Sequence, residues 1–172
     1  LRALALLYFI PDTGCRAGGI CGLRWSDVNL VTRQAQVTEK YGKKRTVFFL
    51  DITRQALEAW HMITQDSEFV FCAMRDWRVG LQLTPTGLYQ IIRDLSEAAG
   101  ISDDQRVSPH MLRHMFATEA DAAGISAEYL QALMGHEKRE TTQRYIHRSN
   151  RLLQEAHDHH SPLLKLINEE RR

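Results

Sequence analysis

Two basic side chains near the start of a predicted helix are the first candidates for chemistry. His110 and Arg113 lie three residues apart, so both side chains project from one face of a helix that Ser108 and Pro109 begin. The N-terminus of a helix also presents backbone N–H groups and a partial positive charge. Together these groups would bind an anion. An isolated pair of this kind is more often an exposed polar face, so it needs partners elsewhere in the chain.

A histidine and a tyrosine further along the chain are the second candidates. His136 follows the helix-stopping Gly135 in a predicted loop, and Tyr145 lies nine residues later. A free phenol has a pKa near ~10 and is a poor nucleophile at neutral pH. It becomes reactive only beside cations and a proton acceptor. The alternative is that Tyr145 packs its ring on the core and leaves its hydroxyl in water.

Two more cations lie at the edges of predicted elements. Arg16 follows the break at Thr13 and Gly14, where a short helix begins, and Lys40 ends a predicted hairpin strand. The structural alternative for Arg16 is a bond to backbone carbonyls at the helix start. The net charge of the chain is only +1, so any nucleic-acid contact must come from local clusters such as 40–45. On composition alone that cluster is a solvated turn.

The elements that must position these residues are mostly helical. Apolar spacing and turn residues predict an α+β fold with one small antiparallel three-stranded sheet. The tail contains a polar patch (His157, His159 and His160), which we interpret as a solvated stretch in preference to a metal site. Helices are expected over 1–10, 17–23, 52–63, 86–99, 109–123, 126–134, 141–148 and after Pro162, strands over 28–30, 35–40 and 46–50, and an edge strand at 69–71.

The length of 172 residues suits one domain with a tail, and no apolar run approaches the roughly 20 residues that a membrane-spanning helix needs. The three cysteines form no C-x-x-C pair and leave an odd thiol, which favours a reducing compartment. We expect a domain over 1–150, followed by a C-terminal tail helix over 151–172. The apolar tail helix would be costly to leave in water, so it either folds back on its own domain or docks on another subunit.

Taken together, five segments of the chain resemble the conserved boxes of the tyrosine recombinases, the phage integrase family, in order and spacing. Any one box would be weak evidence, but five in register are specific. The resemblance spans about residues 2–148. The matching segments are T-G-C-R at 13–16 with G-L-R-W-S-D at 22–27, V-T-E-K-Y-G-K-K-R-T-V at 37–47, T-P-T-G-L at 84–88, H-M-L-R-H-M-F-A-T at 110–118, and L-M-G-H at 133–136 with T-T-Q-R-Y at 141–145.

The resemblance implies a DNA strand-transferring enzyme that works through a 3′-phosphotyrosyl intermediate. Tyr145 would be the nucleophile, Arg16 and Arg113 would hold the non-bridging oxygens of the phosphate, and Lys40 would protonate the departing 5′ oxygen. His110 would accept a proton or donate to the phosphate, and His136 would hydrogen-bond the phosphoryl group. Further DNA contacts are expected from Lys43, Lys44, Arg45 and Arg144.

The resemblance also sets expectations for cofactors and partners. No cofactor, metal or ATP is required, since no Asp/Glu cluster lies among the boxes and the phosphotyrosyl bond stores the energy for rejoining. The partner would be double-stranded DNA in the bacterial cytoplasm, at the nucleoid, with a homotetramer formed by the full-length protein and no membrane or small-molecule ligand. Family members carry an N-terminal core-binding domain, which nothing here resembles. We therefore expect weak DNA affinity and little recombination from this chain by itself.

The chain departs from the family pattern at two places. The first box usually has an acidic residue three positions after the arginine, where this chain has Gly19. The hairpin lysine is usually flanked by glycines, which are Glu39 and Tyr41 here. These departures weaken the expected support of Arg16 and leave Lys43 as the fallback for Lys40.

Two alternative functions stay open from the sequence. A type IB topoisomerase would share the same chemistry, although the final boxes favour integrases. A DNA-binding regulator without catalysis would use residues 125–146 as a helix-turn-helix. Arg16, Arg113 and His136 discriminate between these classes, because a repressor has no use for them.

Overall fold

The computed structural model describes residues 1–75, 77, 79–101, 107–135 and 150–169. Within these ranges the fold is mostly helical with one three-stranded antiparallel sheet, which confirms the predicted class. No helix among the described residues is long and apolar enough to span a membrane. In chain order the elements are α1 (Arg2–Thr13), α2 (Ala17–Cys21), η1 (Trp25–Asp27), β1 (Val28–Asn29), β2 (Gln34–Thr38), η2 (Lys40–Gly42), β3 (Lys44–Phe48), α3 (Asp51–His61), α4 (Pro85–Ala98), α5 (Pro109–Ala122), α6 (Ala127–Met134), α8 (Asn150–His160) and α9 (Pro162–Glu169).

Helix α1 runs past the end predicted at its proline. Pro11 lies inside the helix, which continues to Thr13 and ends at Gly14 in the left-handed conformation, φ 57°. A proline removes one backbone hydrogen bond. The buried face nevertheless continues through this turn, and the Thr13 hydroxyl donates to the Phe9 carbonyl at 2.6 Å. Packing and side-chain bonding therefore outweigh the backbone hydrogen bond that Pro11 lacks. The last turn of α1 thus lies directly before the start of α2.

The sheet is a meander in the order β1-β2-β3. Val37 and Val47 are buried, and burial alternates along β2 but not along β3, whose last two residues are both buried. The β2–β3 connection is the predicted hairpin, with Tyr41 at a positive φ of 65° in its turn. The strand predicted at 69–71 is wrong: Phe69 forms a single bridge with Arg24, because the chain there turns away after one pair.

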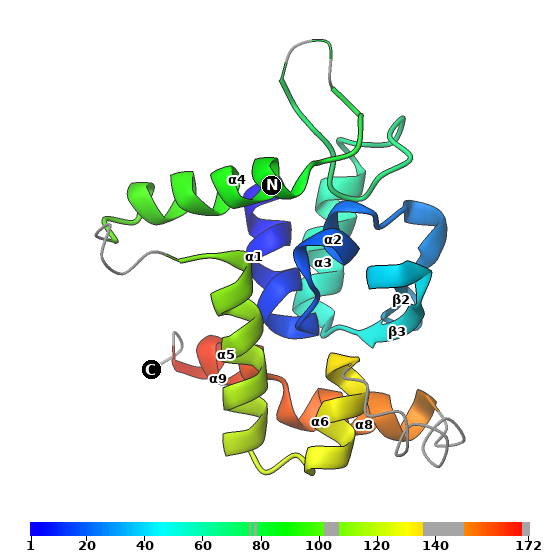
Figure 1. The fold of residues 1–172 in the computed structure, drawn as a ribbon, viewed down its shortest axis with the longest axis vertical. Helices are drawn as coiled ribbons and strands as arrows, with labels where there is room; N and C mark the ends of the chain where they lie inside the picture. Colours follow the sequence, from blue (N-terminus) through cyan, green and yellow to red (C-terminus); the bar gives the residue numbers. More distant parts are fainter. Residues whose placement is uncertain (76, 78, 102–106, 136–149, 170–172) are drawn as a thin grey trace.

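The main core lies between α1, the sheet, α3 and α4. Figure 1 shows α1 and α3 side by side at the centre, with the sheet beside α3 and α4 crossing near the chain's N-terminus. Its largest fully buried side chains include Phe9, Phe49 and Phe71, and the Phe9 ring on α1 packs against each of the other two rings. Burial of apolar area on this scale is what holds such a layer together.

A second buried cluster joins α5, α6 and α8. Phe48 from the end of β3 and Phe116 from α5 form its centre, with Leu133 and Met134 from the last turn of α6. In Figure 1 this layer lies below α1 and the sheet. It places the end of α6 next to the turn that follows α1, which is where the candidate site lies.

The tail differs from the expected solvated stretch. Residues 150–160 form α8, and His157 is buried at 2% exposure. The polar appearance of the segment misled the prediction because its buried polar groups find partners inside the protein. Helix α9 packs against α1 and α5 of the same chain, and Leu163 is 2% exposed.

Candidate active site

Arg113 is buried at the centre of the site. It projects from the second turn of α5, and its residue exposure is 5%. Nη1 donates to the carbonyl oxygen of Gly14, and Nη2 donates to the carbonyl oxygen of Met134 at 2.9 Å. The guanidinium therefore joins the turn after α1 to the end of α6, and its plane is fixed by two segments that lie far apart in the sequence.

Arg16 and Arg45 meet at one carboxylate. Nη1 of Arg16 lies 2.9 Å from Oε2 of Glu39, and Nε of Arg45 lies 3.0 Å from Oε1 of the same side chain. Arg45 also donates to the Leu133 carbonyl and lies 3.8 Å from Sγ of Cys15. The Arg16 side chain is 41% exposed, whereas those of Arg45 and Glu39 are 9% and 8% exposed. Arg16 is thus the member of this group that faces solvent.

The three arginines and the one carboxylate leave this cluster with a positive balance. Burial, and then the like charges of Arg16 and Arg45, lower the pKa of Arg113 to about 10, so it stays charged at neutral pH. Burial also raises the pKa of the Cys15 thiol, which keeps it neutral. A partly buried group of guanidinium ions attracts an anion, and planar N–H forks match the oxygens of a phosphate.

Two glycines let the segments of the site approach each other. A Cβ atom on Gly14 would lie 2.7 Å from Cδ1 of Phe116, and one on Gly135 would lie 2.8 Å from Cδ of Arg45. Both glycines have positive φ values, 57° and 63°, which disfavour any other residue. The glycines of the first and last boxes are therefore required by the packing around the arginines.

The hairpin turn begins at Glu39, beside the arginine cluster, and its sequence carries Lys40, Lys43 and Lys44. The N–H of Glu39 donates to the Lys43 carbonyl at 2.7 Å, and the N–H of Gly42 donates to the Glu39 carbonyl at 3.2 Å, which closes the turn that contains Lys40. Lys43 and Lys44 are exposed, as a DNA contact requires. Arg45 points into the protein, where the Glu39 carboxylate and the Leu133 carbonyl accept its N–H groups, so its contact with DNA stays a prediction.

His110 lies one turn before Arg113, at the exposed start of α5. The Ser108 hydroxyl caps this helix by accepting from the N–H of Met111 at 3.2 Å, as predicted. His136, Arg144 and Tyr145 lie outside the described residues, and their roles stay predictions.

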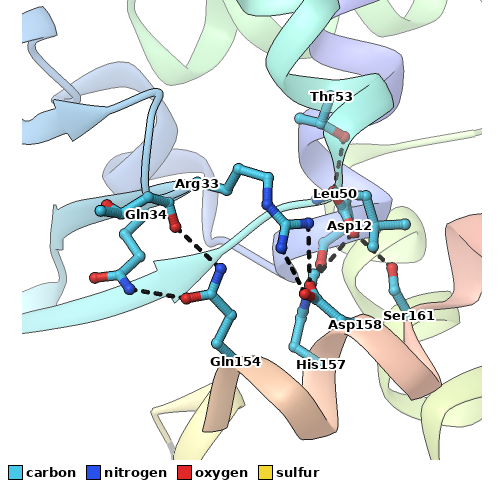
Figure 2. A network of polar contacts seen from close by, with 10 residues as sticks. Asp12, Arg33, Gln34, Leu50, Thr53, Gln154, His157, Asp158 and Ser161 are labelled. Atoms are coloured by element: carbon cyan, nitrogen blue, oxygen red, sulfur yellow. Dashed lines mark hydrogen bonds and ion pairs between the residues drawn. The ribbon is translucent and has the colours of Figure 1, made fainter. Parts of the chain in front are cut away.

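A buried polar network around Asp12, in the last turn of α1, was missed by the sequence analysis (Figure 2). The carboxylate of Asp12 accepts from the N–H of Leu50 and the hydroxyl of Thr53, both at 2.7 Å, and from Ser161 at 2.5 Å. Nε2 of His157 lies 2.7 Å from the Asp12 carbonyl oxygen. A histidine in an amphipathic pattern was the available signal, since the hydrophobic residues 153, 156 and 163 surround it in sequence. The network fixes the last turn of α1, two residues before Gly14.

The tail histidines do not form a shared site. His157 binds Asp12, and Nδ1 of His160 lies 2.9 Å from the Ala123 carbonyl oxygen. Across the part of the chain that the structure describes, no three His, Cys, Asp or Glu side chains are grouped so that they could hold a metal ion.

Comparisons with known proteins agree on one family. The profile of the phage integrase family matches residues 1–151. Tyrosine recombinase XerC of Corynebacterium glutamicum is 32% identical over 160 residues, which cover 91% of this chain and 50% of that protein. Tyrosine recombinase XerD of Yersinia pestis is 31% identical over 169 residues, covering 94% of this chain and 55% of that protein. The chain thus spans about half the length of the curated relatives it matches.

Solved structures give the same fold. The crystal structure of XerA recombinase superposes with a TM-score of 0.70 at 32% identity, covering 94% of this chain and 59% of that one. The XerH recombinase bound to its difH substrate in a pre-cleavage complex superposes with a TM-score of 0.66 at 24% identity, covering 87% of this chain and 44% of that one. The second likeness is one of fold alone.

Proposed function

Because this chain belongs to the phage integrase family, we propose that it is the catalytic part of a site-specific recombinase that cleaves and rejoins DNA strands. Residues 1–150 form the catalytic domain and residues 151–172 the tail in this proposal. The observation that carries it is that Arg16 and Arg113, 97 positions apart in the sequence, belong to one cluster of cations. Gly135, the glycine of the last box, packs against Arg45 of the same cluster.

In the cleavage step the phenol oxygen of Tyr145 bonds to the scissile phosphorus, and the bond from phosphorus to the 5′ oxygen breaks. The phenol proton passes to an acceptor, for which His110 is the candidate, and Lys40 gives a proton to the departing 5′ oxygen. His136 donates a hydrogen bond to the phosphoryl group. The product is a 3′-phosphotyrosyl bond and a free 5′-hydroxyl, so the reverse reaction rejoins the strand without ATP.

The arginines supply the electrostatic part of this reaction. A phosphodiester carries one negative charge, and the pentavalent transition state concentrates more charge on its equatorial oxygens. Arg113 is held by two backbone carbonyls before substrate arrives, so its orientation needs little reorganisation. By analogy with oxyanion-hole donors, a preorganised cation of this kind is worth roughly 3–4 kcal/mol in the transition state.

The proposed partner is double-stranded DNA, bound in the bacterial cytoplasm at the nucleoid, and the full-length protein would act as a homotetramer. Lys43 and Lys44 support the DNA contact because they are exposed beside the cluster. XerH was solved with a difH substrate. The topoisomerase and regulator alternatives are not favoured, because the relatives reported above are named as recombinases.

The decisive experiment traps the covalent intermediate. The chain is incubated with nicked duplexes tiled across the DNA that flanks its gene, so that a short cleaved strand diffuses away and the adduct accumulates. We expect a denaturant-resistant protein–DNA adduct whose modified peptide contains Tyr145. Tyr145→Phe should form none, and Arg113→Ala should slow adduct formation by about 100- to 1,000-fold. An adduct in the Tyr145→Phe protein, or one on another residue, would overturn the assignment.

A further inference from the structure

Glu39 holds the arginine cluster together but has no part in the reaction described above. Its side chain is 8% exposed, and each of its carboxylate oxygens receives a different guanidinium: Oε2 from Arg16 and Oε1 from Arg45. A buried carboxylate is costly unless it is paired in this way. Burial alone would raise the pKa of Glu39, but the hydrogen bonds and charges of the two arginines outweigh it and hold that pKa below its ordinary value.

The carboxylate occupies space that a side chain at position 19 would otherwise use. A Cβ atom built on Gly19 would lie 4.0 Å from Oε1 of Glu39, 3.7 Å from Cβ of Val37 and 3.6 Å from the Thr38 carbonyl oxygen. These are ordinary contacts, so a Cβ atom fits there. A longer acidic side chain at 19 would have to share the position that Glu39 fills.

Glu39 also connects two functional segments through the backbone. Its N–H and carbonyl groups both bond within the hairpin turn, to Lys43 and Gly42. Lys40 is the next residue in the chain. The side chain therefore fixes Arg16, while the backbone of the same residue fixes the turn that carries the lysine.

We propose that Glu39 is a positioning residue of the strand-cleavage site. Its carboxylate holds Arg16 in place beside Arg113 and connects the lysine hairpin to the arginines. It does so from the space that the carboxylate of an acidic residue at position 19 would occupy. The inference rests on the proposed function. Arg16 is the exposed member of the cluster, so without Glu39 its long side chain would sample many conformers in water. A guanidinium has five N–H donors, so one bond through Nη1 leaves it able to hold a phosphate.

The test uses a charge-removing variant and an exchange of positions. Glu39→Gln keeps the shape of the side chain and removes its charge. Glu39→Gly and Gly19→Glu each disturb the arrangement, and the double variant G19E/E39G moves the carboxylate to the other backbone position. Glu68→Gln is the matched control, because Glu68 pairs with Arg24 at an exposed site away from the cluster. All variants are measured at a temperature where each is fully folded.

Single-turnover adduct formation and binding of inorganic phosphate are measured for each variant. We expect Glu39→Gln to slow adduct formation by about 100-fold, as for a misplaced catalytic group. Phosphate binding should be unchanged or tighter, because the cluster loses a negative charge. The double variant should be faster than Glu39→Gly by about tenfold or more, as coupled positions require. The Glu68→Gln control should keep the full rate.

Two results would overturn the inference: an undiminished rate in Glu39→Gln, or a folded double variant no faster than Glu39→Gly. If the unaltered chain forms no adduct on any duplex, the proposed function fails, and the positioning is judged from the Nε–H resonance of Arg16 by NMR. Glu39→Gln must then move that resonance to the position of a free guanidinium, and the double variant must restore it. An Arg16 resonance indifferent to both changes would reject the positioning role.

Discussion

Nε2 of His157 lies 2.7 Å from the backbone carbonyl oxygen of Asp12 and 3.2 Å from Oδ1 of its carboxylate, although the two residues are 145 positions apart in the chain. Figure 2 shows that the Asp12 carboxylate also accepts hydrogen bonds from the N–H of Leu50 and from the hydroxyls of Thr53 and Ser161. One buried carboxylate thus joins α1, the start of α3 and the junction of α8 with α9. The tail is connected by this contact to the turn on which the arginines depend.

The first prediction concerns the pH dependence of stability. Burial alone would lower the pKa of His157, but Asp12 outweighs it and raises that pKa to about 9. Since the folded pKa lies above the unfolded value near ~6.5, this contact stabilises the fold fully below that pH and loses its contribution as pH rises to about 9. The loss is on the order of 3 kcal/mol. Urea unfolding at several pH values between 6 and 9.5 measures it.

The comparison for this prediction is between variants, because other groups also titrate above pH 8. His157→Gln should be less stable than the unaltered chain at pH 6, and the gap should close towards pH 9.5. His159→Gln, at an exposed position on the same helix, should leave the pH profile unchanged. A gap between His157→Gln and the unaltered chain that is constant over this range would refute the charged contact.

The second prediction concerns the backbone at Gly14. Gly14→Ala places a Cβ atom 2.7 Å from Phe116 at a φ of 57°, so we expect a loss of about 2–4 kcal/mol from strain and repacking. Gly18→Ala is the matched control. Its Cβ atom would meet nothing within 4 Å inside α2, so it should be neutral or stabilise by up to about 1 kcal/mol. Thermal or urea unfolding of both variants decides; equal effects would contradict the steric argument.

Local signals in the sequence predicted most of the helices, and they selected Arg16 and Arg113 as candidate site residues. The caps at Ser108 and Ser126 were readable because their hydroxyls accept bonds within the same few residues, from Met111 and Tyr129. The end of α1 was not readable, because its continuation past Pro11 depends on tertiary packing. Propensity near a proline is a weak guide when the following turn is buried.

The role of Glu39 shows a second limit. Gly19 and Glu39 are each a departure from the family pattern, but no single-sequence signal says that they lie close together. The structure brings them together because β2 runs beside α2. The partners of Arg45 could not be predicted for the same reason: a run of cations in a turn predicts exposure, and only the fold shows that one of them is held by Glu39 and Leu133.

The third prediction concerns the ion pair between α8 and the turn that precedes β2. Nη2 of Arg33 lies 2.6 Å from Oδ2 of Asp158, with side-chain exposures of 27% and 28% (Figure 2). Because the pair is partly exposed, a double-mutant cycle with Arg33→Ala and Asp158→Ala should give a coupling of about 0.5–1 kcal/mol that falls as salt is raised. Urea unfolding at low and high salt measures it. A coupling unaffected by salt would show that the pair acts through packing.

The last prediction separates Arg45 from its lysine neighbours. The Arg45 side chain is only 9% exposed and is bonded within the protein, so Arg45→Gln should cost about 2–3 kcal/mol of stability, because it leaves the Glu39 carboxylate and the Leu133 carbonyl short of donors. Lys43→Gln and Lys44→Gln should leave stability within about 0.5 kcal/mol, since both residues are exposed. Replacing each lysine that contacts a DNA phosphate should lower the magnitude of the salt slope of DNA binding by about 1, whereas Arg45→Gln, in its folded state, should not. Fluorescence anisotropy with a labelled duplex over a salt series, beside urea unfolding, measures both quantities. A change in the salt slope for folded Arg45→Gln, without loss of stability, would return Arg45 to the DNA-binding surface.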